Sequence, residues 1–152
     1  MSLIHQFREG YDLLCHAIEG LTSIEMKQVI EEGKWTIYEN VIHVVDADLA
    51  YTERIKRVIA EDEPVFLPFD QDLWTKRLNY HECNIEDYLT LFRLSRETIS
   101  SLLEGMAPEL WTRSGKKGEE VITLKQLVEA LIGHVENHVR TIERLRNRMN
   151  LH

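Results

Sequence analysis

The sequence lacks the features that mark membrane and secreted proteins. No run of about 18 apolar residues is present, and the first twelve residues, MSLIHQFREGYD, show no basic segment followed by an apolar one. The two cysteines, Cys15 and Cys83, lie far apart and form no CxxC motif. Such sparse thiols are typical of a reducing compartment. These absences predict a cytoplasmic protein that does not associate with a membrane.

Positive charge is also scarce. The chain has 18 Lys and Arg against 26 Asp and Glu, a formal net charge of −8, and no stretch gathers more than a few basic residues. A chain of this charge repels a phosphate backbone, so we expect no nucleic-acid partner. At 152 residues, with 43% apolar and 29% charged residues, it is long enough to bury a core as one folded unit. The sequence predicts a single domain spanning residues 1–152.

Four stretches repeat their apolar residues at the three-four spacing of an amphipathic helix. They cover residues 3–20, about 37–61, about 85–105 and 124–149, with a short helical turn expected between 22 and 33. Thr36 with Glu39, and Thr123 with Gln126, have the spacing of a helix-starting capping box. No strand-like alternation or internal repeat is present, and residues 114–118 are expected to form a turn. The pattern therefore predicts an all-α fold, a four-helix bundle.

The segment between residues 61 and 83 loses the helical period. Two of the three prolines, Pro64 and Pro68, fall here and would break a helix. The segment is long for a connection and rich in aromatic residues, which favours packing over the bundle. Extended at roughly 3.3 Å per residue, it could cross the bundle and let the second and third long helices run parallel. Phe66, Phe69 and Trp74 are candidates to wall a pocket there, although ordinary packing, as expected for Trp35, is the alternative.

Two histidines occupy consecutive positions of the apolar seam of the last helix. His134 and His138 follow Leu131 in that seam, and residues four apart are neighbours on a helix, so both can face one ion. Leaving two such polar groups unpaired would cost roughly 1–3 kcal/mol each. His43, beside the seam of the second long helix and near the small residue Ala47, is the best third ligand. Three imidazoles with an open position suit a catalytic metal site; the alternative is that the histidines are unrelated or only structural.

The neighbouring acidic residues fit no other metal motif. Glu136 lies two residues after His134, so it points about 200° away on a helix, unlike the Glu of an HExxH metalloprotease. Glu39 could reach the ion or orient its water, or could serve only as the partner of Thr36 in the capping box. Asp46 could orient a ligand or be an exposed helix residue. No catalytic residue follows from the spacing alone.

One combination of motifs resembles a known family. Residues 33–46, GKWTIYENVIHVVD, are followed about 90 residues later by His134-x-x-x-His138-x-x-x-Ile142. In this order and spacing they resemble the DinB/YfiT-like superfamily of bacterial proteins, over nearly the whole chain. The resemblance implies an up-down-down-up four-helix bundle with a long crossover between helices 2 and 3. It also implies a homodimer and a divalent ion, nickel or zinc, held by His43, His134 and His138.

The resemblance also suggests an activity. Characterised members of the family are mainly metal-dependent transferases that act on low-molecular-weight thiols such as bacillithiol or mycothiol, beside a thiol-dependent isomerase and hydrolases. It therefore implies a divalent-metal-dependent enzyme, either a transferase that joins a small-molecule thiol to an electrophile or a related hydrolase. The alternative is a non-catalytic metal-binding stress-response protein with the same bundle. No organic cofactor is expected.

Overall fold

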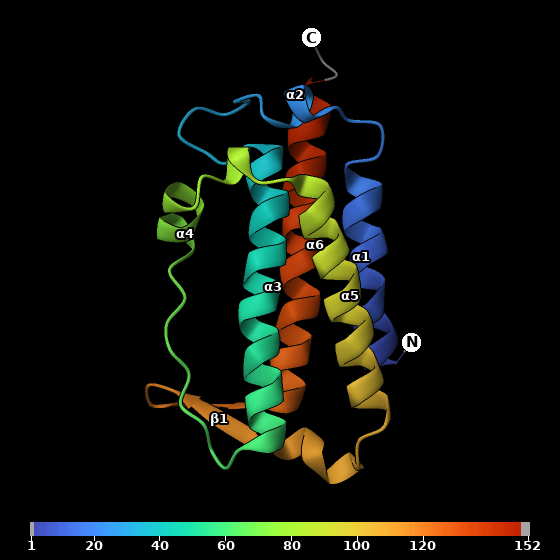
Figure 1. Cartoon of the computed structure of the whole chain (residues 1–152), viewed down its shortest axis with the longest axis vertical. Coiled ribbons are helices and arrows are strands. Elements are labelled where there is room, and N and C mark those ends of the chain that lie inside the picture. The colour runs from blue at the N-terminus through green and yellow to red at the C-terminus, as the bar shows by residue number, and fades with distance from the viewer. Residues whose placement is uncertain (1, 150–152) are drawn as a thin grey trace.

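Four long helices enclose the core of the protein. The computed structural model describes residues 2–149, so residue 1 and residues 150–152 of the predicted domain lie outside it. The helices α1 (Leu3–Ala17) and α3 (Ile37–Ala60) each pack against both α5 (Ile85–Glu104) and α6 (Leu124–Met149) (Figure 1). A short helix, α2 (Ser23–Met26), lies in the connection from α1 to α3, as expected. The predicted helical bundle is confirmed, and none of the described helices is long and apolar enough to span a membrane.

The predicted capping boxes set where two long helices begin. The Thr36 hydroxyl accepts the Glu39 N–H at 3.1 Å, and the Glu39 carboxylate accepts the Thr36 N–H at 3.0 Å. Thr123 and Gln126 exchange the same two hydrogen bonds, at 3.1 and 2.9 Å, at the start of α6. Because these bonds satisfy amide groups that the first helical turn leaves free, they fix the first residue of α3 and of α6. These two helices carry the three candidate histidines.

A buried ion pair connects all four long helices. Arg96 of α5 and Asp48 of α3 are each 1% exposed, and the Arg96 Nε lies 3.1 Å from the carboxylate. The guanidinium also donates to the carbonyl oxygens of Phe7 on α1, at 2.5 Å, and Leu131 on α6, at 3.3 Å. Gly10 on α1 leaves room for it, since a Cβ there would lie 2.8 Å from the guanidinium. The pair thus sets how closely the four helices approach.

The crossover between α3 and α5 runs along the outside of α3 from one end of the bundle to the other (Figure 1). It contains a seven-residue helix, α4 (Gln71–Arg77), and a 3₁₀ turn, η1 (Tyr80–Glu82). The carboxylate of Asp70 caps α4 by accepting the Leu73 N–H at 3.1 Å. The sequence predicted an irregular segment, which is wrong for these residues. Two turns are too short to display a helical period, and the capping residue was the only local signal.

A small hairpin corrects the all-α expectation. Between the 3₁₀ turn η2 (Pro108–Thr112) and α6, the strands β1 (Ser114–Lys117) and β2 (Glu120–Thr123) pair antiparallel. Gly118 turns the chain between them at φ +61°, a conformation that suits glycine. The start of the crossover joins the hairpin, since Phe66 N–H donates to Lys116 O at 2.7 Å. The strands have only four residues each and pair across a tight turn, so their sequence shows no strand-like alternation and residues 114–118 suggested only a turn.

Candidate metal centre

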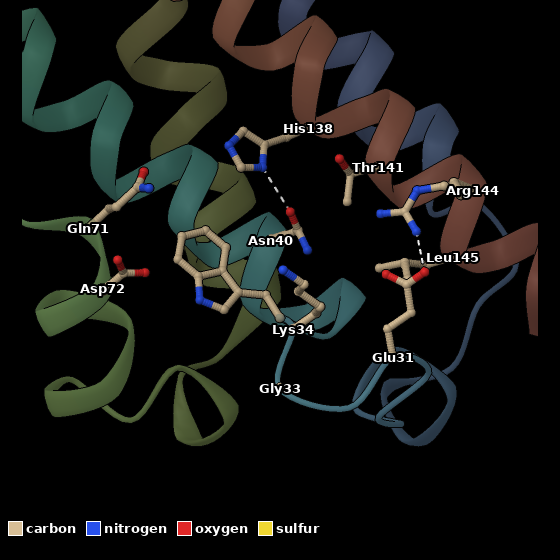
Figure 2. A pocket seen from close by; sticks show the side chains of 11 residues that line it. Glu31, Gly33, Lys34, Asn40, Gln71, Asp72, His138, Thr141, Arg144 and Leu145 are labelled. Carbon is tan, nitrogen blue, oxygen red and sulfur yellow. Dashed lines mark hydrogen bonds and ion pairs between the residues drawn. The ribbon is translucent and has the colours of Figure 1, made fainter.

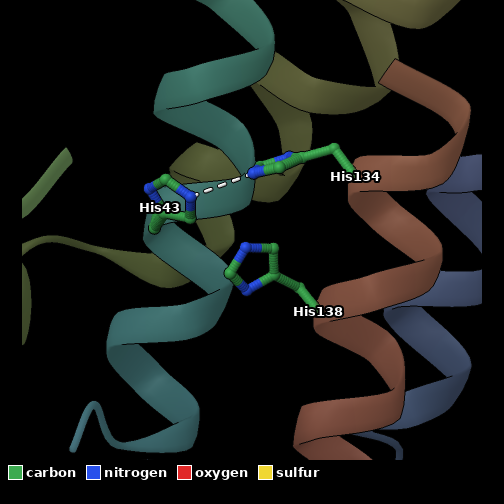
Figure 3. A group of neighbouring side chains, drawn as sticks. All are labelled: His43, His134 and His138. Carbon is green, nitrogen blue, oxygen red and sulfur yellow. Dashed lines mark hydrogen bonds between the residues drawn. The ribbon is translucent and has the colours of Figure 1, made fainter. Parts of the chain in front are cut away.

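Three histidines from two helices converge on one point. His43 comes from α3, and His134 and His138 come from α6, with their rings turned toward one another (Figure 3). One nitrogen of each ring lies within 4.8 Å of the others, and the Nε2 atoms of His43 and His134 are 3.0 Å apart. Ligands bound tetrahedrally at 2.0–2.1 Å from zinc lie about 3.3 Å apart. The His43–His134 separation is close to this value, and ring nitrogens as far apart as 4.8 Å would draw together around an ion of that size.

The cluster is not satisfied by the protein alone. His43 is fully buried and the other two rings are partly buried, yet the Nδ1 atoms of His43 and His134 have no hydrogen-bond partner among the described residues. Buried ring nitrogens normally have one. The described residues place no carboxylate against these rings that would hold them as cations. Neutral imidazoles that face one another, with no carboxylate holding them as cations, are what a ligand-binding cluster requires.

Burial keeps the three rings uncharged. It lowers the pKa of His43 to about 3 and that of His134 to about 4, and in both cases the neighbouring histidines add to the effect. Burial also lowers the pKa of His138. At neutral pH each ring is therefore an imidazole with a free lone pair. This is the protonation state that binds a divalent metal ion.

Asn40 orients one of the rings. The Asn40 side-chain N–H donates to the Thr36 carbonyl at 2.9 Å, so its amide oxygen faces the His138 Nδ1, 2.8 Å away. An oxygen can only accept, so His138 must carry its hydrogen on Nδ1 and leave Nε2 free as a ligand atom. Sequence reasoning missed Asn40. Its position three residues before His43, on the same face of the helix, was the available signal.

Aromatic side chains cover the cluster. The ring of Trp35 lies 4.7 Å from that of His43 and stacks on His138 at an interplanar angle of 13°. Phe69 of the crossover stacks on His43 at 6.3 Å, with Trp74 packed against Phe69. Phe69 thus walls the site and Trp74 supports it, whereas Trp35 was expected only to pack. Phe66 lies instead against the hairpin and Arg54.

The acidic residues considered from the sequence lie elsewhere. Glu39 forms the capping box, Asp46 accepts a hydrogen bond from the hydroxyl of Tyr80 at 2.8 Å, and Glu136 is exposed. None of these interactions involves a histidine of the cluster. The capping alternative for Glu39 agrees with the structure, and the ligand-orienting role considered for Asp46 belongs to Asn40.

Two cavities open beside the histidines. One, of about 440 Å³, contains His138 and Asn40 together with charged residues of both signs: Lys34, Arg144, Glu31 and Asp72 (Figure 2). The other, of about 280 Å³, is lined by His134, which lies one helical turn before His138 on α6, and otherwise mainly by apolar side chains. The cluster therefore lies between a polar cavity and an apolar one.

A four-helix bundle with such a cluster defines a class of metal-binding bundle proteins, and comparison with known proteins supplies the family. Residues 6–142 match the model of the DinB superfamily. The chain therefore belongs to the DinB superfamily, and the resemblance seen in the sequence is confirmed.

The related proteins carry names that refer to metals. The chain is 28% identical over 147 residues, 95% of its length and 83% of the relative's, to a protein of Geobacillus thermodenitrificans named as a proposed metal-dependent hydrolase. It is 23% identical to YfiT of Bacillus subtilis, over 90% of this chain and 78% of YfiT, which is named likewise.

Two solved structures share the fold. YfiT superposes with a TM-score of 0.90 at 23% identity, covering 97% of this chain and 86% of YfiT, and is described as a four-helix bundle of unusual topology. A mycothiol-dependent maleylpyruvate isomerase superposes with a TM-score of 0.70 at 14% identity, covering 91% of this chain and 60% of the isomerase. At these identities the likeness concerns the bundle, and the activity has to be argued from the site.

Proposed function

We propose that the protein is a divalent-metal-dependent enzyme in which His43, His134 and His138 hold a nickel or zinc ion. The observation that carries this proposal is the convergence of three neutral imidazoles whose ring nitrogens lie within 4.8 Å of one another. Such an ion is a Lewis acid that lowers the pKa of a water or thiol bound to it, which supplies a nucleophile at neutral pH. The metal-related names of the relatives agree with this assignment.

The surrounding residues prepare the site for a polar co-substrate. Asn40 holds the His138 tautomer, while Trp35 and Phe69 keep bulk water from the rings. In the polar cavity, Lys34 can bind a carboxylate and Asp72 can bind an ammonium group, whereas Arg144 is paired with Glu31 (Figure 2). Cysteine carries both groups, as does any low-molecular-weight thiol that keeps a free amino group and a carboxylate. We therefore propose a transferase that joins such a thiol to an electrophile.

A related hydrolase is the second candidate, favoured by the names of the relatives. It would use water where the transferase uses a thiol, within the same cluster. The non-catalytic alternative, a metal-binding stress-response protein, would bind the ion and turn over neither kind of substrate. Turnover is therefore what separates the three.

Turnover assays on protein loaded with one equivalent of Zn²⁺ or Ni²⁺ test the proposal. Monobromobimane is offered with bacillithiol, mycothiol or cysteine, and an ester substrate is offered separately. We expect thiol conjugation that His134→Ala abolishes and that His16→Ala, at an exposed histidine outside the cluster, leaves unchanged. Ester hydrolysis alone would favour the hydrolase, and loaded protein inactive on both would favour the binding protein. Activity that survives His134→Ala would refute the site.

We also propose a homodimer in the cytoplasm that binds neither nucleic acid nor membrane, and an up-down-down-up order of the long helices. The crossover along α3 supports that order, because it returns the chain to the end from which α3 starts (Figure 1). Light scattering tests the dimer: the expected mass is twice the 17.9 kDa of one chain. A mass of one chain at micromolar concentration would contradict it.

A further inference from the structure

Two arginines are buried in this bundle, and only one has a counter-charge. Arg96 is paired with Asp48. Arg54 of α3 is 5% exposed, and within residues 2–149 it forms no ion pair with a carboxylate. A buried cation without an anion is costly, so its position requires an explanation.

The protein satisfies Arg54 only in part. One terminal nitrogen donates to the carbonyl oxygen of Leu67 in the crossover. The guanidinium carbon lies 4.3 Å from the centre of the Tyr51 ring and 5.3 Å from that of Phe66. Cation–π contacts offset part of the cost of burial but leave the net charge. No hydrogen bond to a described residue involves the two other guanidinium nitrogens.

This guanidinium lines the apolar cavity of about 280 Å³ next to the candidate metal centre. Apart from Arg54, its walls are Tyr51, His134 and apolar residues of β2 and α6: Ile122, Leu127, Ala130 and Leu131. The other charged residues there are Lys117 and Glu120, an exposed pair facing each other across the hairpin. Their charges cancel, so the cavity is apolar with one buried positive charge.

We propose that this cavity binds a small molecule with an apolar body and one carboxylate, held by Arg54. A guanidinium presents two parallel N–H donors that match a carboxylate, and the apolar walls suit an aliphatic or aromatic chain. Since His134 also lines the cavity, the far end of the ligand points to the metal centre. This assigns the cavity to the second substrate of the proposed enzyme. That this ligand is a substrate rests on the proposed function, whereas the binding of a carboxylate at Arg54 does not.

Binding to metal-free protein tests the proposal, since EDTA prevents an ion from capturing the carboxylate. Calorimetry compares butyrate, hexanoate and 4-phenylbutyrate with the corresponding neutral amides, which have the same shape. We expect wild type to bind an acid about tenfold or more tighter than its amide. Arg54→Met should lower this preference below about twofold while still binding the amide, which shows that the cavity is intact.

A matched control is available one turn along the same helix. Arg57 pairs with Glu53 and Glu61 and does not line the cavity, so Arg57→Met should keep the preference of wild type. Ala130→Trp should fill the cavity and weaken both acid and amide.

Several results would overturn the proposal. Wild type could bind acid and amide equally, or bind no probe at all. The preference for the acid could survive Arg54→Met. Acid binding could also be unaffected by Ala130→Trp, which would place the ligand in the polar cavity. A preference that appears only after Zn²⁺ is added would also overturn it, because the ion would then hold the carboxylate. If the turnover assay detects no thiol transfer and none of these results is found, the proposed reaction is refuted but the carboxylate site at Arg54 is not.

Discussion

The bundle contains two buried polar clusters that bridge the same helices, α3 and α6, and they differ in whether the protein completes them. In the Asp48–Arg96 pair, all three guanidinium nitrogens donate to the carboxylate or to carbonyl oxygens. In the histidine cluster, the Nδ1 atoms of His43 and His134 lack partners among the described residues, and the rings are neutral. The first is complete without a ligand and holds the helices together. The second leaves ring nitrogens without a protein partner and presents its remaining ring nitrogens to a ligand.

The largest expected effect falls on the complete cluster. Arg96→Met leaves the Asp48 carboxylate buried without its partner, which should lower the free energy of unfolding by about 3–5 kcal/mol. Urea denaturation followed by circular dichroism measures this. The double variant Arg96→Met/Asp48→Leu should recover much of the lost stability, because the unpaired Asp48 carboxylate is then absent. A loss below about 1 kcal/mol in Arg96→Met would show that the pair is not structural.

Metal should stabilise the incomplete cluster. Zn²⁺ or Ni²⁺ at one hundred times its Kd should raise the free energy of unfolding of wild type by about 2.7 kcal/mol. Thermal melts with and without metal measure the change, and His43→Ala should not show it. His16→Ala, outside the cluster, should respond as wild type does. An equal rise in His43→Ala would place the ion elsewhere on the chain.

Asn40 is the protein group that hydrogen-bonds to the histidine cluster, since its amide oxygen accepts from the His138 Nδ1–H. Asn40→Ala frees the His138 tautomer and should weaken metal binding about 10- to 100-fold, as loss of a ligand-orienting group does. Competition with a chromophoric chelator measures the affinity. Thr141→Ala is the control, because Thr141 lines the same cavity as Asn40 and its hydroxyl donates to the Asn137 carbonyl rather than to a histidine. Affinity equal to that of wild type in Asn40→Ala would remove the orienting role.

The smallest effect is a dependence on pH in metal-free protein. The pKa of His43 is about 3 in the folded state and 6.5 when exposed, so below pH 6.5 the unfolded chain binds more protons than the folded one. Stability is therefore fully present above pH 6.5 and falls as the pH decreases toward the folded value, by about 1 kcal/mol for this group between pH 6.5 and 5.5. Denaturation of wild type and His43→Ala across this range measures the difference. If the free energy of unfolding of wild type and of His43→Ala changes equally with pH, the predicted contribution of His43 is wrong.

Much of the architecture could be predicted from local patterns. The period of apolar residues gave four long helices, and two capping boxes gave the starts of α3 and α6. The spacing of His134 and His138 suggested a shared ligand. His43 was the best third ligand from its place beside the seam of another helix, and the resemblance to a family implied the same residue. These predictions depend on residues one helical turn apart, which is why sequence alone suffices.

The remaining features depend on contacts between distant segments. The hairpin is joined by residues 65 and 66 of the crossover, and α4 packs against α3, contacts that no short window contains. Trp35 and Asn40 gain their roles from α6, about 100 residues away. Arg54 is notable because no carboxylate within residues 2–149 pairs with it, which only the folded structure shows. The cavities are likewise products of packing.

X-ray absorption spectroscopy at the metal edge tests the central claim most directly. Protein loaded with one equivalent of Zn²⁺ or Ni²⁺ should show three imidazole nitrogens, for zinc at about 2.0–2.1 Å, and two after His134→Ala. A first shell without imidazole scattering, or a spectrum unchanged by His134→Ala, would contradict the account.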